Sequence, residues 1–235
     1  MEIIASSPAL TDLVATLASE PIIGLDTEFL RERTYFPRLA LVQLRWSTGS
    51  ALVDPLAVDV AGLRPLLESE RLFVIHACTQ DLEILEHSAG GVPKSLFDPQ
   101  VGAGFLGYRT PSLDTLTRDL LGQELNKGDQ LTDWTRRPLT DSQLRYALAD
   151  VEHLLELHRL LIERLEARGR LEWVLEECER QLSRDRSRPD PETQWWKLKG
   201  QRKLPRRAAG VAQALAAYRE REAARRDLPS RFVLS

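Results

Sequence analysis

The sequence predicts an α/β domain with a mixed sheet of five strands, flanked by helices and followed by a helical C-terminal extension. Three strand-like segments follow one another closely, and Ser47-Thr48-Gly49 joins the second to the third as a hairpin turn. Two further segments are separated from these by helical patterns, as parallel pairing requires. The expected strands cover residues 22–28, 39–46, 50–53, 72–75 and 96–98.

Helices are expected where apolar residues recur at helical spacing and capping signals bound them. Thr79 can cap one helix, which Gly90-Gly91 would end. Thr140 and Gln143 form a capping-box pattern at the start of a long helix, and Gly169 is suited to its C-terminus. The expected helices cover residues 8–17, 63–67, 79–87, 101–106, 113–121, 140–168, 170–180 and 204–226.

Composition indicates a globular protein of one large domain, or of one domain with an appendage. The chain has 235 residues, 43% of them hydrophobic, and a net charge of −3. No apolar run approaches the ~20 residues of a membrane span, and the N-terminus lacks signal-peptide character. The two cysteines lie far apart and do not indicate a disulfide framework. We therefore expect a cytoplasmic protein without membrane association.

The charge is unevenly distributed. Residues 181–235 carry 14 Lys and Arg against 6 Asp and Glu, whereas residues 1–180 carry 18 against 29. An acidic body with a basic tail is typical of a metal–carboxylate site that acts on a polyanion. A solvated pair of basic helices explains the charges equally well.

Asp26 and Glu28 end the first predicted strand. Residues i and i+2 of a strand share one face, so both carboxylates point the same way. Like charges so close repel unless a cation lies between them, and Mg²⁺ prefers such oxygen ligands. The alternative is a solvated strand end, which is the commoner reading of Asp-x-Glu alone.

Two later segments supply further candidates. Asp81 lies in the first turn after the fourth predicted strand, at the rim where open α/β sheets place ligands. Tyr146 and Asp150 are four residues apart on the long helix and share a face. Each has an ordinary alternative: a helix-dipole partner for Asp81, a half-buried core residue for Tyr146 and solvated surface for Asp150.

These motifs in order resemble the ribonuclease D-like 3′–5′ exonucleases, the tyrosine-containing (DEDDy) branch of the DEDD superfamily. The matching stretches are Gly24-Leu25-Asp26-Thr27-Glu28-Phe29, His76-Ala77-Cys78-Thr79-Gln80-Asp81-Leu82 and Tyr146-Ala147-Leu148-Ala149-Asp150-Val151. Connecting stretches such as Leu52-Val53-Asp54-Pro55-Leu56 and Thr132-Asp133-Trp134 are also similar. The resemblance covers residues 20–165 closely.

The resemblance implies a ribonuclease H-like fold and two-metal phosphodiester hydrolysis. Asp26, Glu28, Asp81 and Asp150 would hold two Mg²⁺ or Mn²⁺ ions, and Tyr146 would orient the attacking water. A phenol with a pKa near ~10 is a poor general base, so orientation is favoured. The implied substrates are RNAs with a free 3′ end, such as tRNA precursors and small RNAs, and the implied products are nucleoside monophosphates released from that end.

The implied substrate contacts are Thr27, Phe29 and Tyr35 at the terminal nucleotide, with Lys127 and Gln130 in the loop before the third motif. An aromatic ring here could stack a base, although core packing is an equal alternative for Phe29. Elsewhere, Trp134 is expected to pack in the core and His76 to be structural. Asp54 and Asp98 receive no role.

The expected domains are an exonuclease domain at 1–180, a linker at 181–203 and a partial HRDC-like helical segment at 204–235. Basic residues of that segment could attract RNA by counterion release. No obligate protein partner is expected. Two alternatives stay open: a 3′–5′ exonuclease on single-stranded DNA, and an inactive nucleic-acid-binding module.

Overall fold

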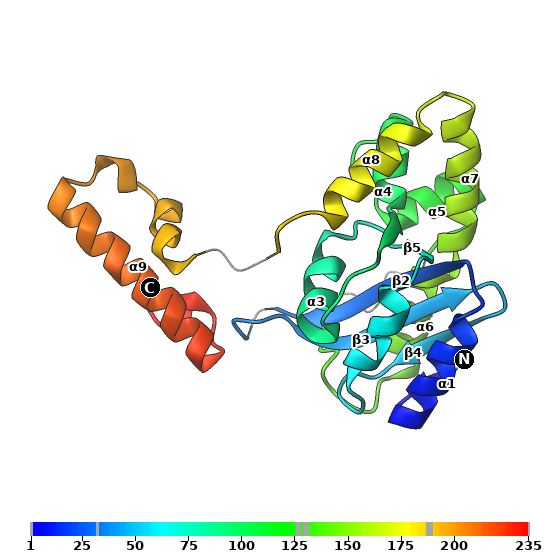
Figure 1. Ribbon diagram of the computed structural model, residues 1–235, viewed down its shortest axis with the longest axis horizontal. Helices are drawn as coiled ribbons and strands as arrows, with labels where there is room; N and C mark the ends of the chain where they lie inside the picture. Colours follow the sequence, from blue (N-terminus) through cyan, green and yellow to red (C-terminus); the bar gives the residue numbers. More distant parts are fainter. Residues whose placement is uncertain (1, 32, 126–127, 129–131, 187–189, 235) are drawn as a thin grey trace. The chain divides into compact units, whose positions relative to one another are not determined.

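The computed structural model describes residues 2–31, 33–125, 128, 132–186 and 190–234 (Figure 1). The chain forms two compact units. We call Met1–Phe29 with Leu39–Arg184 the sheet unit, and Leu30–Arg38 with Asp185–Ser235 the tail unit. Each unit is described by itself.

The sheet is mixed and has helices on both faces, which confirms the predicted fold class (Figure 1). Among the described residues it has six strands in the order β1-β4-β3-β2-β5-β6. Pairing is parallel for β1 with β4, β2 with β5 and β5 with β6, and antiparallel for β3 with β4. The strands are β1 Glu2–Ile4, β2 Ile22–Leu30, β3 Arg38–Trp46, β4 Gly49–Val53, β5 Leu72–Val74 and β6 Ser95–Phe97.

The prediction of five strands was wrong by one, because β1 was missed. This strand has three residues, and Ile3 pairs with Leu52 of β4. β5 and β6 are equally short, but Glu2-Ile3-Ile4 has neither an apolar run nor a turn signal to mark it, so its pairing with β4 identifies β1 as a strand.

The helices of the sheet unit follow the predicted ones with small shifts. Thr140 and Gln143 form the predicted capping box, and Gly90 ends α3 in the left-handed region. Thr79 does not cap α3, since that position falls on Cys78, whose side chain makes no capping bond. The helices are α1 Ser7–Leu17, η1 Val60–Leu63, α2 Arg64–Leu67, α3 Thr79–Ala89, α4 Pro99–Phe105, α5 Leu113–Leu121, α6 Asp141–Glu152, α7 Leu154–Glu166 and α8 Leu171–Leu182.

The long helix predicted at 140–168 is two helices, α6 and α7, divided at His153. The apolar spacing continues across the break, so the sequence pattern does not reveal it. Helix α7 begins against Gly24 of β2, where an added Cβ would lie 3.1 Å from Leu155 Cδ1 and 3.2 Å from Leu154 Cβ. The missing side chain at Gly24 therefore lets α7 approach the strand that carries Asp26 and Glu28.

Two apolar clusters form the core of the sheet unit. The larger includes Ile23 and Leu25 of β2, Leu82 and Leu85 of α3 and Leu157 of α7. The smaller includes Leu41, Leu52, Trp134 and Ala147, with Tyr146 packed against it. Because strand β2 and helix α6 are both anchored by buried side chains, the polar residues they carry are held in place.

The tail unit consists of α9 Arg206–Arg226 with η2 Pro191–Lys197, η3 Gln201–Lys203, η4 Ser230–Phe232 and the segment Leu30–Arg38. Arg221 Nη1 pairs with Glu192 Oε1 at 2.5 Å and so joins α9 to η2. The Tyr35 hydroxyl donates to Glu220 Oε2 at 3.2 Å, and the Phe36 amide donates to Asp227 Oδ1 at 3.0 Å.

No helix in the described parts of either unit combines the length and the apolar character needed to cross a bilayer.

Candidate metal-binding active site

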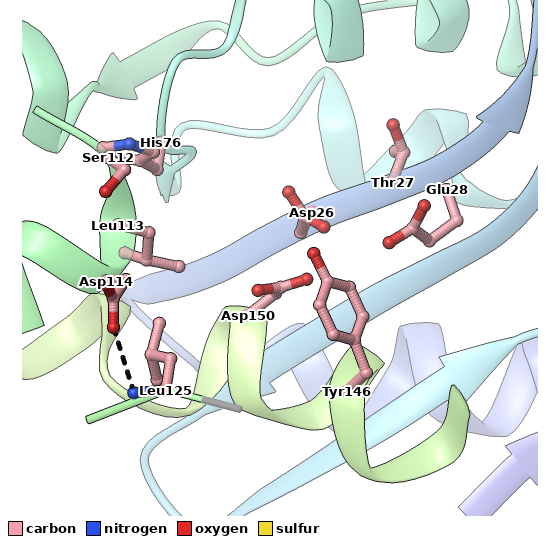
Figure 2. Close-up of a pocket in the computed structure, with 10 residues that line it drawn as sticks. All are labelled: Asp26, Thr27, Glu28, His76, Ser112, Leu113, Asp114, Leu125, Tyr146 and Asp150. Carbon is pink, nitrogen blue, oxygen red and sulfur yellow. Dashed lines mark hydrogen bonds between the residues drawn. The ribbon is translucent and has the colours of Figure 1, made fainter. Parts of the chain in front are cut away.

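A cleft of about 440 Å³ opens in the sheet unit beside β2 and α6 (Figure 2). Asp26 and Glu28 enter it from β2, because alternate residues of a strand share a face. Tyr146 and Asp150 enter it from one face of α6, four residues apart. The cleft therefore gathers four of the five predicted catalytic residues.

Three carboxylates form the centre of the site. One oxygen each from Asp26, Glu28 and Asp150 can be chosen so that all lie within 4.8 Å of one another. The sequence separates the first two from the third by more than 120 positions. Only the packing of α6 against the sheet brings them together.

Asp81 lies beside this centre. It belongs to the first turn of α3, is buried, and accepts a hydrogen bond from Thr27 Oγ1 at 2.6 Å. Thr27 stands between Asp26 and Glu28 on β2, so this bond fixes α3 to the strand. Asp81 also helps to raise the pKa of Asp26 by like-charge repulsion. It is outside the three-carboxylate group, in which Asp26, Glu28 and Asp150 meet.

Burial and mutual repulsion disfavour the charged forms of these acids. Burial, followed by Asp150 and Asp81, raises the pKa of Glu28 to about 9. Burial raises the pKa of Asp81 and of Asp150 to about 7 each, although hydrogen bonding from Tyr146 partly offsets this for Asp150. Burial and then the three other carboxylates also raise the pKa of Asp26 well above its ordinary value.

The donor set fits divalent cations. Oxygen ligands in a cluster are what Mg²⁺ and Mn²⁺ prefer, and none of the described residues lining the cleft is a lysine or arginine. A bound cation would stabilise the charged forms of these acids, which burial disfavours at all four and like-charge repulsion disfavours further at Asp26 and Glu28. Asp26, Glu28 and Asp150 are the residues suited to hold it, with Asp81 adjacent.

Burial first, and then Asp150 and Glu28, raise the pKa of Tyr146 above its ordinary value of 10. The phenol therefore keeps its proton at neutral pH and acts as a hydrogen-bond donor. Its ring lies 5.9 Å from that of Trp134, which is buried as predicted.

Asp98 positions the start of α3, a role that the sequence analysis did not assign. Its Oδ1 accepts from the amides of Ala77 at 2.9 Å and Gln100 at 2.8 Å, and Oδ2 accepts from the amide of Cys78 at 3.1 Å. Ala77 adopts φ 55°, an unfavourable left-handed conformation for a residue with a Cβ. Asp98 therefore holds the strained connection that delivers Asp81.

Asp54, also without an assigned role, anchors the segment before α6. Arg137 Nε and Nη2 donate to its two oxygens at 2.7 Å each. The same guanidinium donates to the carbonyls of Ala40 and Trp134 at 2.7 and 2.8 Å. This bidentate pair fixes Trp134, and through its ring the position of Tyr146. Sequence spacing alone gives no sign of a contact over 83 residues.

Of the described residues that the resemblance implies as substrate contacts, one lines the cleft and the others lie elsewhere. Thr27 lines the cleft, while its hydroxyl bonds Asp81. The Phe29 ring packs against the larger core cluster. Tyr35 belongs to the tail unit, where its hydroxyl bonds Glu220. Lys127 and Gln130 lie outside the described residues.

The far end of the cleft contains His76, which was expected to be structural, and further residues that the motifs did not indicate. Figure 2 shows His76 and Ser112 at one end and Glu28 and Tyr146 at the other. Burial lowers the pKa of His76, so its imidazole is neutral near pH 7. The sequence feature that could have indicated this end of the cleft is the helix start at Pro111-Ser112, because Ser112 caps α5. The cleft is completed by Leu113, Asp114 and Leu125, with the Leu125 amide donating to Asp114 Oδ1 at 3.3 Å.

This α/β fold with an acidic cleft corresponds to a class of nucleases, and the family model for 3′-5′ exonucleases matches residues 1–166. The chain belongs to this 3′-5′ exonuclease family. Within it, the chain is 42% identical to ribonuclease D of Gluconacetobacter diazotrophicus over 99% of its own length and 60% of the relative's. It thus spans about three fifths of the length of this curated relative.

Two solved structures agree with this placement. The crystal structure of Escherichia coli RNase D, described as an exoribonuclease involved in structured RNA processing, matches with a TM-score of 0.93 and 36% identity. That match covers 99% of this chain and 63% of the other. The catalytic core of RRP6 from Trypanosoma brucei matches with a TM-score of 0.82 and 25% identity, over 97% of this chain and 66% of the other.

Proposed function

We propose that the chain is the nuclease part of a metal-dependent 3′–5′ exoribonuclease that removes nucleoside monophosphates from RNA 3′ ends. The observation that carries this proposal is the convergence of Asp26, Glu28 and Asp150 in one cleft. The RNA substrate is suggested by relatives that are named ribonuclease D. Maturation of tRNA precursor 3′ ends is the substrate class we infer.

The proposed chemistry needs a hydrolytic water, a leaving 3′ oxygen and charge stabilisation. Two divalent cations, Mg²⁺ or Mn²⁺, held by Asp26, Glu28, Asp150 and the adjacent Asp81, would activate the water and stabilise the leaving oxygen. Tyr146 remains protonated because its pKa is raised, so its hydroxyl orients the water and does not remove its proton. Thr27 keeps Asp81 in position by its 2.6 Å hydrogen bond.

The walls of the cleft would hold the RNA against the acidic centre. Apolar Leu113 and Leu125 give the nucleotides upstream of the scissile bond a surface to pack on, and Asp26, Asp150 and Glu28 follow further along the cleft (Figure 2). A 3′-terminal nucleotide placed beside Tyr146 and Asp150 presents its phosphodiester to the acidic centre. Sequence-tolerant packing of this kind suits an enzyme that removes any nucleotide.

We also propose that residues 204–235 begin an HRDC-like helical domain, with 1–180 as the exonuclease domain and 181–203 as the linker. Val211, Leu215 and Tyr218 are exposed at spacings of four and three residues along α9. They form one apolar face, which is typical of a helix that packs against further helices.

The test uses matched single-stranded RNA and DNA oligonucleotides labelled at the 3′ end, with either Mg²⁺ or EDTA. Release of labelled mononucleotide from RNA, abolished by EDTA, is the expected result. Equal or faster cleavage of DNA would assign the chain to DNA, and binding without cleavage would make it an inactive binding module. A tRNA precursor with a 3′ extension tests the inferred substrate class.

A further inference from the structure

We propose that a second hollow, next to the catalytic cleft, binds the bases of single-stranded RNA upstream of the reacting 3′ end. This inference rests on the proposed function. The hollow, which we call the aromatic groove, has a volume of about 530 Å³ and is formed by α4 and the segment that follows it. Its lining includes Gln100, Val101, Phe105, Tyr108, Arg109 and Thr110.

The lining of the groove suits nucleic-acid bases. Phe105 and Tyr108 are half-buried, so each ring is held by the core and keeps an accessible surface. The ring of Trp173, which is 55% exposed, lies 6.3 Å from that of Phe105. Aromatic faces stack any base, which matches an enzyme that must accept every sequence.

The charge of the groove favours RNA over an acidic or neutral peptide. Arg109 is exposed at the lining, and no aspartate or glutamate is among the described residues that line it. A second cation, Arg170, donates from Nη1 to the Phe105 carbonyl at 2.6 Å and so lies next to the backbone of one of these aromatic residues. A guanidinium beside aromatic rings can contact the phosphate of a nucleotide whose base is stacked.

One backbone ridge separates the groove from the cleft. Gln100, which lines the groove, donates from Nε2 to the Pro111 carbonyl at 3.0 Å. His76, which lines the cleft, lies close to the same Pro111 backbone. The residues on either side of Pro111 line different hollows: Thr110 lines the groove and Ser112 lines the cleft. The two hollows are therefore neighbours, with Pro111 between their lining residues.

The arrangement of the cleft sets the direction of the RNA. His76 and Ser112 lie at the end of the cleft away from Glu28 and Tyr146 (Figure 2). An RNA whose 3′ end reaches the carboxylates extends its 5′ part toward His76 and Ser112. The ridge at Pro111 and then the aromatic groove follow in that direction, so the groove receives the nucleotides that enter the cleft after each cleavage.

The test compares long and short RNAs with Tyr108→Ala. Binding of a fluorescent RNA of about ten nucleotides is measured by anisotropy with Mg²⁺, in an Asp150→Asn background that prevents cleavage. Loss of one stacking contact should weaken binding by about 5- to 100-fold. Tyr108→Phe keeps the ring and should restore affinity to within about twofold of the parent. Leu175→Ala, which removes an exposed apolar side chain of α8 outside the groove, is the control and should have no effect.

A dinucleotide fills only the cleft, so its cleavage should be unchanged by Tyr108→Ala with Asp150 intact. Arg109→Gln should reduce the slope of log Kd against log salt by about 0.7, as expected for one lost phosphate contact. Unchanged affinity of Tyr108→Ala for the long RNA, or an equal loss for the dinucleotide, would overturn the groove proposal. If the protein with Asp150 intact binds RNA through Tyr108 but never cleaves it, the exonuclease function is refuted and the groove proposal is retained.

Discussion

Replacement of Asp98 by alanine is expected to destabilise the protein strongly, although Asp98 lies outside the cleft. Its side chain is 2% exposed and accepts three backbone hydrogen bonds, from Ala77 at 2.9 Å, Gln100 at 2.8 Å and Cys78 at 3.1 Å. Hydrogen bonds to a charged group contribute about 1.5–3 kcal/mol each and are not additive. We expect the free energy of unfolding to fall by about 4 kcal/mol.

The conservative variant separates the three bonds. Asp98→Asn can keep an oxygen toward Ala77 and Gln100 but places an NH₂ group against the Cys78 amide, which is also a donor. This variant should lose about 1–2 kcal/mol. Asp59→Ala is the matched control, since Asp59 is an exposed cap that accepts one amide bond from Ala61 at 2.9 Å. Its expected cost is about 1 kcal/mol.

Urea denaturation followed by circular dichroism measures the three variants in one series. Asp98→Ala should lower the free energy of unfolding most, followed by Asp98→Asn. Asp59→Ala should lower it by the same amount as Asp98→Asn or by less. Exonuclease activity per folded molecule should also fall for Asp98→Ala, because the connection at Ala77 delivers Asp81. An Asp98→Ala variant no less stable than Asp59→Ala would refute the argument that Asp98 holds the start of α3 through Ala77 and Cys78 and caps α4 through Gln100.

Four further predictions concern the site. Asp150→Asn should lower turnover by several orders of magnitude and leave the circular dichroism unchanged; comparable cleavage would remove Asp150 from the metal site. Tyr146→Phe should reduce turnover less, by about 10- to 100-fold, and an unchanged rate would exclude the hydroxyl from the mechanism. Because the pKa of Glu28 is raised from 4.5 to about 9, the folded protein without metal binds more protons than the unfolded chain between these values. Its Tm in EDTA should therefore fall as pH rises through this window and recover with Mg²⁺; a Tm that rises with pH would contradict the sign. Arg137→Lys should cost about 2 kcal/mol in urea denaturation, since lysine cannot reproduce the bidentate pair with Asp54, whereas a loss as small as that of the exposed Arg159→Lys would contradict it.

The sequence was sufficient for the fold class and for the identity of the acidic residues. Apolar runs and turn signals predicted five of the six described strands, although β5 and β6 are no longer than the missed β1. The i, i+2 spacing of Asp26 and Glu28 and the i, i+4 spacing of Tyr146 and Asp150 determined which side chains share a face. These relations are local, so the backbone geometry of one element settles them.

Tertiary structure decided what depends on distant packing. The helix breaks at His153 and α7 then packs against Gly24, and the roles of Asp98 and Asp54 depend on partners about 20 and 83 positions away. The side-by-side placement of the aromatic groove and the cleft likewise appears only in the folded chain, where Gln100 donates to the Pro111 carbonyl between them. Contacts between remote segments follow from how buried surfaces fit together, and spacing along the chain carries no record of that fit.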